Sequence, residues 1–107
     1  MKKDIIWVSY DLGVQGDYEG LYAWLDSQHA KECGDSLAFI EYHYTKDLVS
    51  ELKKELLKSF KTDKKTRIYT IRQEGEKLKG RFILGGRKTA PWAGFSPVEA
   101  GTEDVDG

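Results

Sequence analysis

The chain has 107 residues, of which 39% are hydrophobic and 33% are charged, and its formal net charge is -1. This length and composition are typical of one soluble domain with a single modest core. No apolar run approaches the roughly 18 residues of a membrane-spanning helix, and the first residues lack the apolar region of a secretory signal. We therefore expect a cytoplasmic protein without a membrane partner. The single cysteine, Cys33, fits a reducing compartment.

The charges are distributed unevenly along the chain. Residues 1–45 contain 3 basic and 8 acidic residues, residues 46–88 contain 14 and 6, and residues 89–107 contain 0 and 4. The middle segment therefore carries a net charge of +8. Such a segment can face a polyanion, or its lysines can simply solvate the outside of a helix and a hairpin. The lysines that would form a basic, nucleic-acid-binding face are Lys53, Lys54, Lys58, Lys61, Lys64 and Lys65.

The first half of the chain alternates between strand and helix patterns. Its β-branched and aromatic start is typical of a central strand that is apolar on both faces. Asp17 is a favourable helix N-cap, and Tyr18, Leu21 and Leu25 then fall on one helix face. The predicted elements are a strand at 4–10, a helix at 17–29, a short strand at 30–33, and a longer strand at 36–44 after a tight turn.

The second half predicts one helix followed by two strands. Leu48, Leu52 and Leu56 form an apolar stripe with lysines on the opposite face. The predicted elements are a helix at 45–60, a strand at 67–73, a hairpin turn at 74–77 and a strand at 78–86. The acidic last ten residues have no such pattern, and we expect them to be disordered.

This order of elements predicts the fold class. Strand, helix, strand, strand, helix, strand is the βαββαβ pattern of ferredoxin-like α+β domains, with both helices on one face of an antiparallel sheet. An additional C-terminal strand follows. We predict a ferredoxin-like domain at 1–88 and a C-terminal extension at 89–107. A single strand over residues 30–44 would change this topology.

Asp11 stands where the first predicted strand enters a loop that contains glycine. Aspartate favours turns because its side chain accepts hydrogen bonds from the neighbouring backbone. A carboxylate at the end of a rigid strand can also bind a metal ion, and the sequence leaves both interpretations open. We expect His29 and His43 to be structural, and Cys33 to be a small buried hydrophobe rather than a nucleophile.

Aromatic residues occur on the predicted strands and beyond the last of them. Those on strands can stack on bases or pack in the core and at a dimer interface, and they are Trp7, Tyr10, Tyr42, Tyr44, Tyr69 and Phe82. Trp92 and Phe95 follow the last predicted strand. An exposed aromatic pair there is unfavourable unless it packs on a second subunit or a bound protein. We therefore predict partner contacts at Trp92 and Phe95.

Six segments follow one another in a particular order along about residues 4–95: "SYDL", "GDYEGLYAWL", "CGDSLAFI", "KDLVSELKKEL", "DKKTRIYTI" and "PWAGF". Taken together, they resemble the SinR-like proteins, which are relatives of CRISPR-associated protein two. The resemblance implies a homodimer that is similar to a β-sandwich and that exchanges its last strand, here at 78–85. It also implies that Asp11 from both subunits binds Mg²⁺ or Mn²⁺ where such proteins cleave RNA or DNA.

The chain also departs from the members of this group that cleave nucleic acid. Those members tend to carry arginines in the first helix and at the first hairpin, whereas the predicted helix at 17–29 has no lysine or arginine. The acidic residues that surround Asp11 in the sequence are Glu19, Asp26, Glu32 and Asp35. They would attract a cation but repel a phosphate backbone. Whether the protein is an enzyme is thus left open, and the alternatives are a non-catalytic dimeric scaffold or protein-interaction module, or a toxin ribonuclease that resembles the VapD group.

Overall fold

The structure is a computed structural model, and it describes residues 1–97. The elements are strand β1 (Lys2–Asp11), helix α1 (Tyr18–Ser27), strands β2 (Lys31–Glu32) and β3 (Leu37–Tyr44), helix α2 (Leu48–Ser59), and strands β4 (Arg67–Glu74) and β5 (Lys77–Leu84). The disorder predicted for the last ten residues lies outside the described residues.

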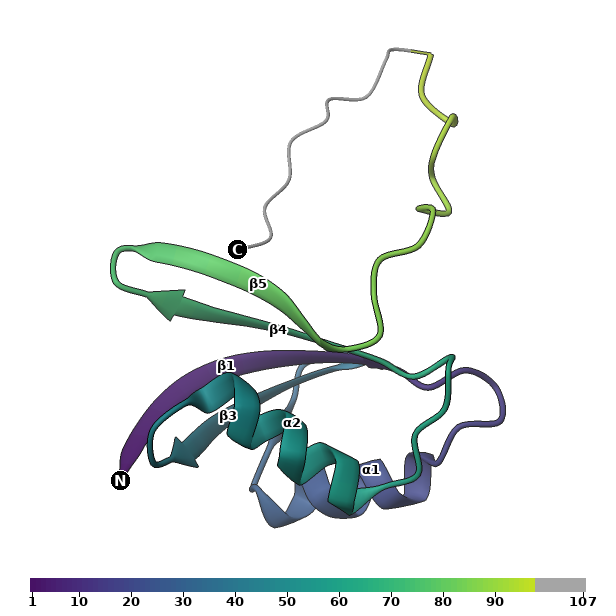
Figure 1. Cartoon of the computed structure of the whole chain (residues 1–107). Helices are drawn as coiled ribbons and strands as arrows, with labels where there is room; N and C mark the ends of the chain where they lie inside the picture. Colours follow the sequence, from purple (N-terminus) through teal and green to yellow (C-terminus); the bar gives the residue numbers. More distant parts are fainter. Residues whose placement is uncertain (98–107) are drawn as a thin grey trace.

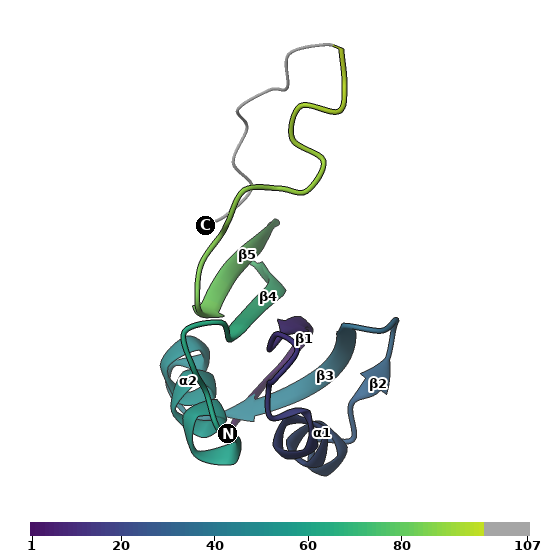
Figure 2. The same ribbon diagram turned by 90° about the vertical axis from the view of Figure 1, so that its right-hand side faces the viewer.

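The strands form one antiparallel five-stranded sheet in the order β2-β3-β1-β4-β5. Strand β1 lies at the centre, as its apolar sequence predicted. Both helices cover the same face of the sheet (Figures 1 and 2). This arrangement confirms the predicted ferredoxin-like sandwich, including the short first hairpin and the additional C-terminal strand. Strand β5 pairs with β4 of its own chain, so the predicted exchange between subunits stays a prediction.

Both helices are shorter than predicted, and local hydrogen bonds explain why. His29 has a φ of 55°, a left-handed conformation that ends α1. At the start of α2, the backbone N–H groups of Thr45, Lys46 and Asp47 donate to the Glu51 carboxylate at 2.8 Å each. The Asp47 carboxylate in turn accepts from the N–H of Ser50 at 3.0 Å. These N-terminal capping bonds fix residues 45–47 outside the helix, which begins at 48.

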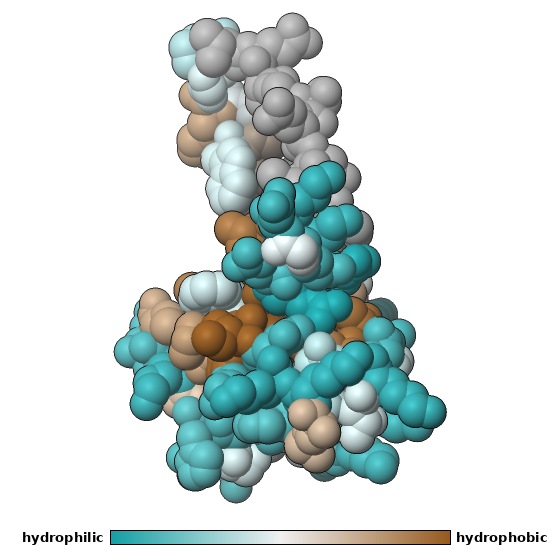
Figure 3. Space-filling view, turned by 90° about the vertical axis from the view of Figure 1, so that its left-hand side faces the viewer, coloured by the Kyte–Doolittle hydropathy of each residue, from teal (hydrophilic) through white to brown (hydrophobic). Residues whose placement is uncertain are grey.

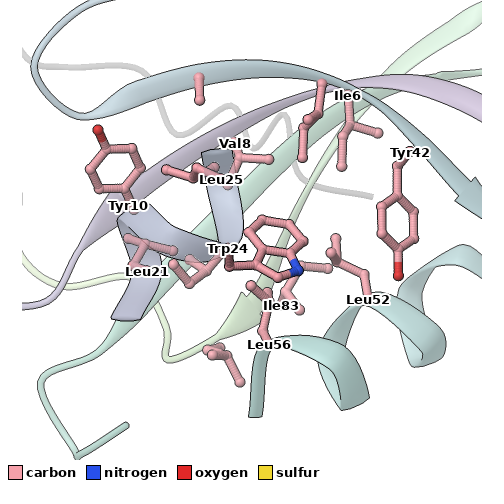
Figure 4. Close-up of a cluster of buried hydrophobic side chains, with 14 of the residues drawn as sticks. Ile6, Val8, Tyr10, Leu21, Trp24, Leu25, Tyr42, Leu52, Leu56 and Ile83 are labelled. Atoms are coloured by element: carbon pink, nitrogen blue, oxygen red, sulfur yellow. The ribbon is translucent and has the colours of Figure 1, made fainter. Parts of the chain in front are cut away.

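The core fills the space between the sheet and the two helices (Figure 4). Its fully buried aliphatic side chains include Ile6 and Val8 of β1, Leu21 of α1, and Leu52 and Leu56 of α2. Burial of these side chains is the main force that holds the helices on the sheet.

One carboxylate lies at the edge of this core and joins three elements. The Glu55 carboxylate of α2 accepts hydrogen bonds from Trp24 Nε1 at 2.9 Å, Gln28 Nε2 at 3.2 Å and the Tyr42 hydroxyl at 2.6 Å. Burial, together with this bond to Glu55, raises the pKa of Tyr42. Because its donors come from α1, the residue that follows α1, and β3, the network ties both of these elements to α2.

No helix of residues 1–97 lies over the opposite face of the sheet (Figure 2). Trp7 of β1 pairs in register with Phe39 of β3 and Ile71 of β4. Its ring meets that of Phe39 edge to face, with centroids 5.5 Å apart. The exposed large hydrophobic residues on this uncovered face are Ile5, Trp7, Ile71 and Leu78. Figure 3 shows hydrophobic side chains, in brown, at the surface between the β4–β5 hairpin and the helical layer.

The predicted burial of Cys33 is wrong. Cys33 directly follows the two-residue strand β2 at the edge of the sheet, and it is exposed. Because β2 is the outermost strand of the sheet, none of the described strands lies beyond it to cover Cys33. Tyr10 and Tyr42, by contrast, are buried in the core.

Candidate functional site

Asp11 ends β1 opposite Arg67, the first residue of β4. One carboxylate oxygen, Oδ2, accepts from Arg67 Nη2 at 3.0 Å, and Oδ1 accepts from the N–H of Gly13 at 3.0 Å. The hydrogen bond from Arg67, followed by that from Gly13, lowers the pKa of Asp11 below its usual range. Asp11 is therefore ionised at neutral pH and forms an ion pair with Arg67.

This geometry bears on the two interpretations of Asp11. The hydrogen bond from Gly13 N–H is that of a turn-forming aspartate, and Gly13 itself has a φ of 75°. Residues 1–97 contain no group of three or more His, Cys, Asp or Glu side chains that could hold a metal ion. A hard divalent cation prefers several oxygen ligands, and among residues 1–97 this site offers a single carboxylate already bonded by a guanidinium. The described donors of one chain therefore do not fit Mg²⁺ or Mn²⁺, and a metal shared between two copies of Asp11 stays a prediction.

A cavity of about 660 Å³ lies beside Asp11, on the uncovered side of the sheet. The ends of β1, β4 and β5 form one wall, and the segment that follows β5 forms the other. Three cationic residues line it: Arg67, Arg87 and Lys88. Among the described residues that line it, Asp11 is the one acidic residue. The described residues that line the cavity thus carry three cationic groups and one carboxylate.

Aromatic side chains form much of the remaining wall. The rings of Tyr69 and Phe82 meet edge to face with centroids 4.8 Å apart. The guanidinium carbon of Arg87 lies 5.9 Å from the Tyr69 centroid and 5.7 Å from the Phe82 centroid, within the range of a cation–π contact. Gly80 of β5 permits this packing, since a Cβ at that position would collide with the Tyr69 hydroxyl. The two rings therefore hold Arg87 at the cavity.

The segment after β5 carries the two aromatic residues predicted as partner contacts. It leaves the end of β5 and extends away from the sheet (Figure 1). Trp92 is 73% exposed and Phe95 is 85% exposed. Trp92 lines the cavity, whereas Phe95 does not. Two turn hydrogen bonds, Ala93 N–H to Ala90 and Phe95 N–H to Trp92, fold the backbone around Trp92. The structure therefore separates the two residues that the sequence grouped together.

The predicted lysine face is also divided. All six lysines are exposed, in α2 and in the loop that follows it. Lys65 lies against Gly13 and so borders the Asp11 end of the sheet. Lys53, Lys54 and Lys58 lie on α2, which packs on the other face of the sheet from the cavity.

Sequence reasoning missed Arg67, Arg87 and Lys88. The antiparallel pairing of β1 with β4 could have pointed to Arg67, because it places the start of β4 opposite the end of β1. Arg87 and Lys88 carry no such signal. Their position depends on the path of the chain after β5.

Comparisons with models of protein families, with curated proteins and with solved structures found no match. None of the helices in residues 1–97 is long and apolar enough to cross a membrane. What the protein does must therefore be inferred from its own residues.

Proposed function

We propose that the protein binds nucleic acid, RNA or DNA, as a homodimer, through the cationic end of its sheet. The observation that carries this proposal is the convergence of Arg67, Arg87 and Lys88 on one cavity. Guanidinium and ammonium groups are the donors that recognise phosphate oxygens. Lys65 at the adjacent loop extends the cationic surface beyond the cavity. The SinR-like resemblance, which implies a nucleic-acid partner, supports the same proposal.

The uncovered face of the sheet supports the homodimer. Trp7 and Ile71 are each 37% exposed and Ile5 is 49% exposed, so apolar surface runs across the central strands. Monomeric proteins rarely leave such contiguous apolar surface in water. A second copy packed face to face over these three residues, none of which lines the cavity, would cover the apolar surface as in a β-sandwich and leave the cavity open to a ligand.

Binding is tested by fluorescence anisotropy with labelled RNA and DNA over a series of salt concentrations. Affinity should fall as salt rises, because each neutralised phosphate releases counterions. Arg67→Gln and Lys88→Gln should each weaken binding and flatten the salt slope by about 1. Lys77→Gln, at the distant β4–β5 turn, is the matched control and should bind like the wild type.

The same samples test cleavage, with Mg²⁺, Mn²⁺ or EDTA and with Asp11→Ala beside the wild type. Metal-dependent cutting that is lost in Asp11→Ala would support a metal shared between subunits, since residues 1–97 of one chain contain no group of three or more ligands that could hold it. Absence of any salt-dependent binding to RNA or DNA would overturn the proposed function. The exposed Trp92 and Phe95 would then favour the second candidate, a non-catalytic protein-interaction module.

A further inference from the structure

We infer that the cavity beside Asp11 binds one unpaired nucleotide of single-stranded nucleic acid, with its base stacked on Trp92 and its phosphate held by Arg67, Arg87 and Lys88. This inference rests on the proposed function and deepens it. It adds a binding preference for single-stranded nucleic acid over a duplex, which phosphate contacts alone would not give.

The lining of the cavity favours a ligand that is aromatic at one end and anionic at the other. Its volume of about 660 Å³ lies within the range of small-molecule sites. Tyr69, Phe82 and Trp92 supply aromatic surface, and the basic residues supply positive charge. A nucleotide has both parts. Membrane lipids and acidic peptides offer the anion without an obligatory aromatic ring.

The charges at the cavity favour a phosphate over a neutral group. Asp11 neutralises part of the charge of Arg67 through their 3.0 Å ion pair. Arg87 and Lys88 add two further positive charges to the same lining. Because the Asp11 carboxylate is held by Arg67 and by the Gly13 N–H, its repulsion of an incoming phosphate is reduced.

Trp92 is the feature that requires an unpaired base. Trp92 lines the cavity and is 73% exposed, and the turn hydrogen bonds at residues 90–95 fold its backbone. A base in a duplex is already stacked on its neighbours, so its face is not available to an aromatic side chain. Bases of a single strand can stack on such a ring whatever their sequence.

The test compares one labelled oligonucleotide as a single strand and as a blunt duplex, at low salt, with the full chain. The wild type should bind the single strand more tightly. Trp92→Ala should weaken single-strand binding by roughly 5- to 150-fold, the measured range for loss of one stacked base. Trp92→Phe should restore most of the affinity. Phe95→Ala is the matched control, because Phe95 lies on the same segment but outside the cavity, and it should bind like the wild type.

The outcomes separate this inference from the proposed function. Equal binding of duplex and single strand, with Trp92→Ala indistinguishable from Phe95→Ala, would overturn the inference and leave nucleic-acid binding intact. Absence of binding to either form would overturn both. Adenosine monophosphate that competes as strongly as the whole strand would assign the cavity to a free nucleotide, and would also overturn the single-strand inference.

Discussion

The two faces of the sheet carry similar side chains but meet different surroundings. Along β1, Ile6 and Val8 are 0% exposed beneath the helices, whereas Ile5 and Trp7 on the other face are 49% and 37% exposed. Successive strand residues point to opposite faces, so these four neighbours differ only in what lies over them. Helices α1 and α2 cover one face of the sheet (Figures 1 and 2). The apolar character of the other face, which no helix of residues 1–97 covers, is the reason why we propose that a second copy packs on it.

The largest effect on stability should come from a substitution that creates a cavity in the core between the helices and the sheet. Leu52 on α2 is fully buried, and Leu52→Ala should lower the free energy of unfolding by about 2–5 kcal/mol. Leu57→Ala on the same helix is the matched control, since Leu57 is 50% exposed, and it should cost far less. Urea denaturation followed by circular dichroism measures both. Equal losses would mean that the helices do not cover the sheet as described.

A charge on the uncovered face should act on association rather than on folding. Ile71→Lys places an ammonium group in the middle of the proposed dimer interface, where burial of an unpaired charge is strongly unfavourable. We expect a folded monomer by light scattering, with the circular dichroism spectrum of the wild type. Leu57→Lys on α2 makes the same kind of change on the outer surface and should remain dimeric. A wild type that is itself monomeric would exclude the homodimer.

The same contrast explains how much of the fold could be predicted from the sequence. Periodicity depends on neighbouring residues, so the helical stripe of Leu48, Leu52 and Leu56 and the alternation of β4 identified the elements correctly. Helix ends were less accurate, because they depend on side-chain bonds such as those of Glu51. Cys33 was misjudged because burial depends on what lies beside a strand.

The site was predicted only in part, since it is assembled from distant segments. Asp11 could be singled out because a strand and a glycine loop flank it directly. Its partner Arg67 lies 56 residues further along the chain and meets it only through the register of β1 and β4. Lys88 and Trp92 join them through the path of the chain after β5, for which no periodic pattern exists.

The smallest predicted effect concerns the N-terminus of helix α2, which packs on the covered face of the sheet. Three backbone N–H groups donate to the Glu51 carboxylate and lower its pKa from 4.5 to about 2. Because the pKa is lower in the folded state, this stabilisation is fully present above about pH 4.5. It is lost as the pH falls through about 2, where the folded protein also takes up the proton.

Glu51→Gln removes the charge while keeping the shape of the side chain. The melting temperature should therefore fall by a few degrees at pH 7, and the difference from the wild type should shrink at pH 3 and below. Glu76→Gln, in the turn between β4 and β5, removes the same charge far from α2 and should show no such pH-dependent difference. A Glu51→Gln difference that stays constant from pH 7 to pH 2 would mean that the side chain acts by shape and neutral hydrogen bonding alone. The backbone hydrogen bonds to Glu51 would then stabilise the start of α2 without a contribution from the charge of the carboxylate.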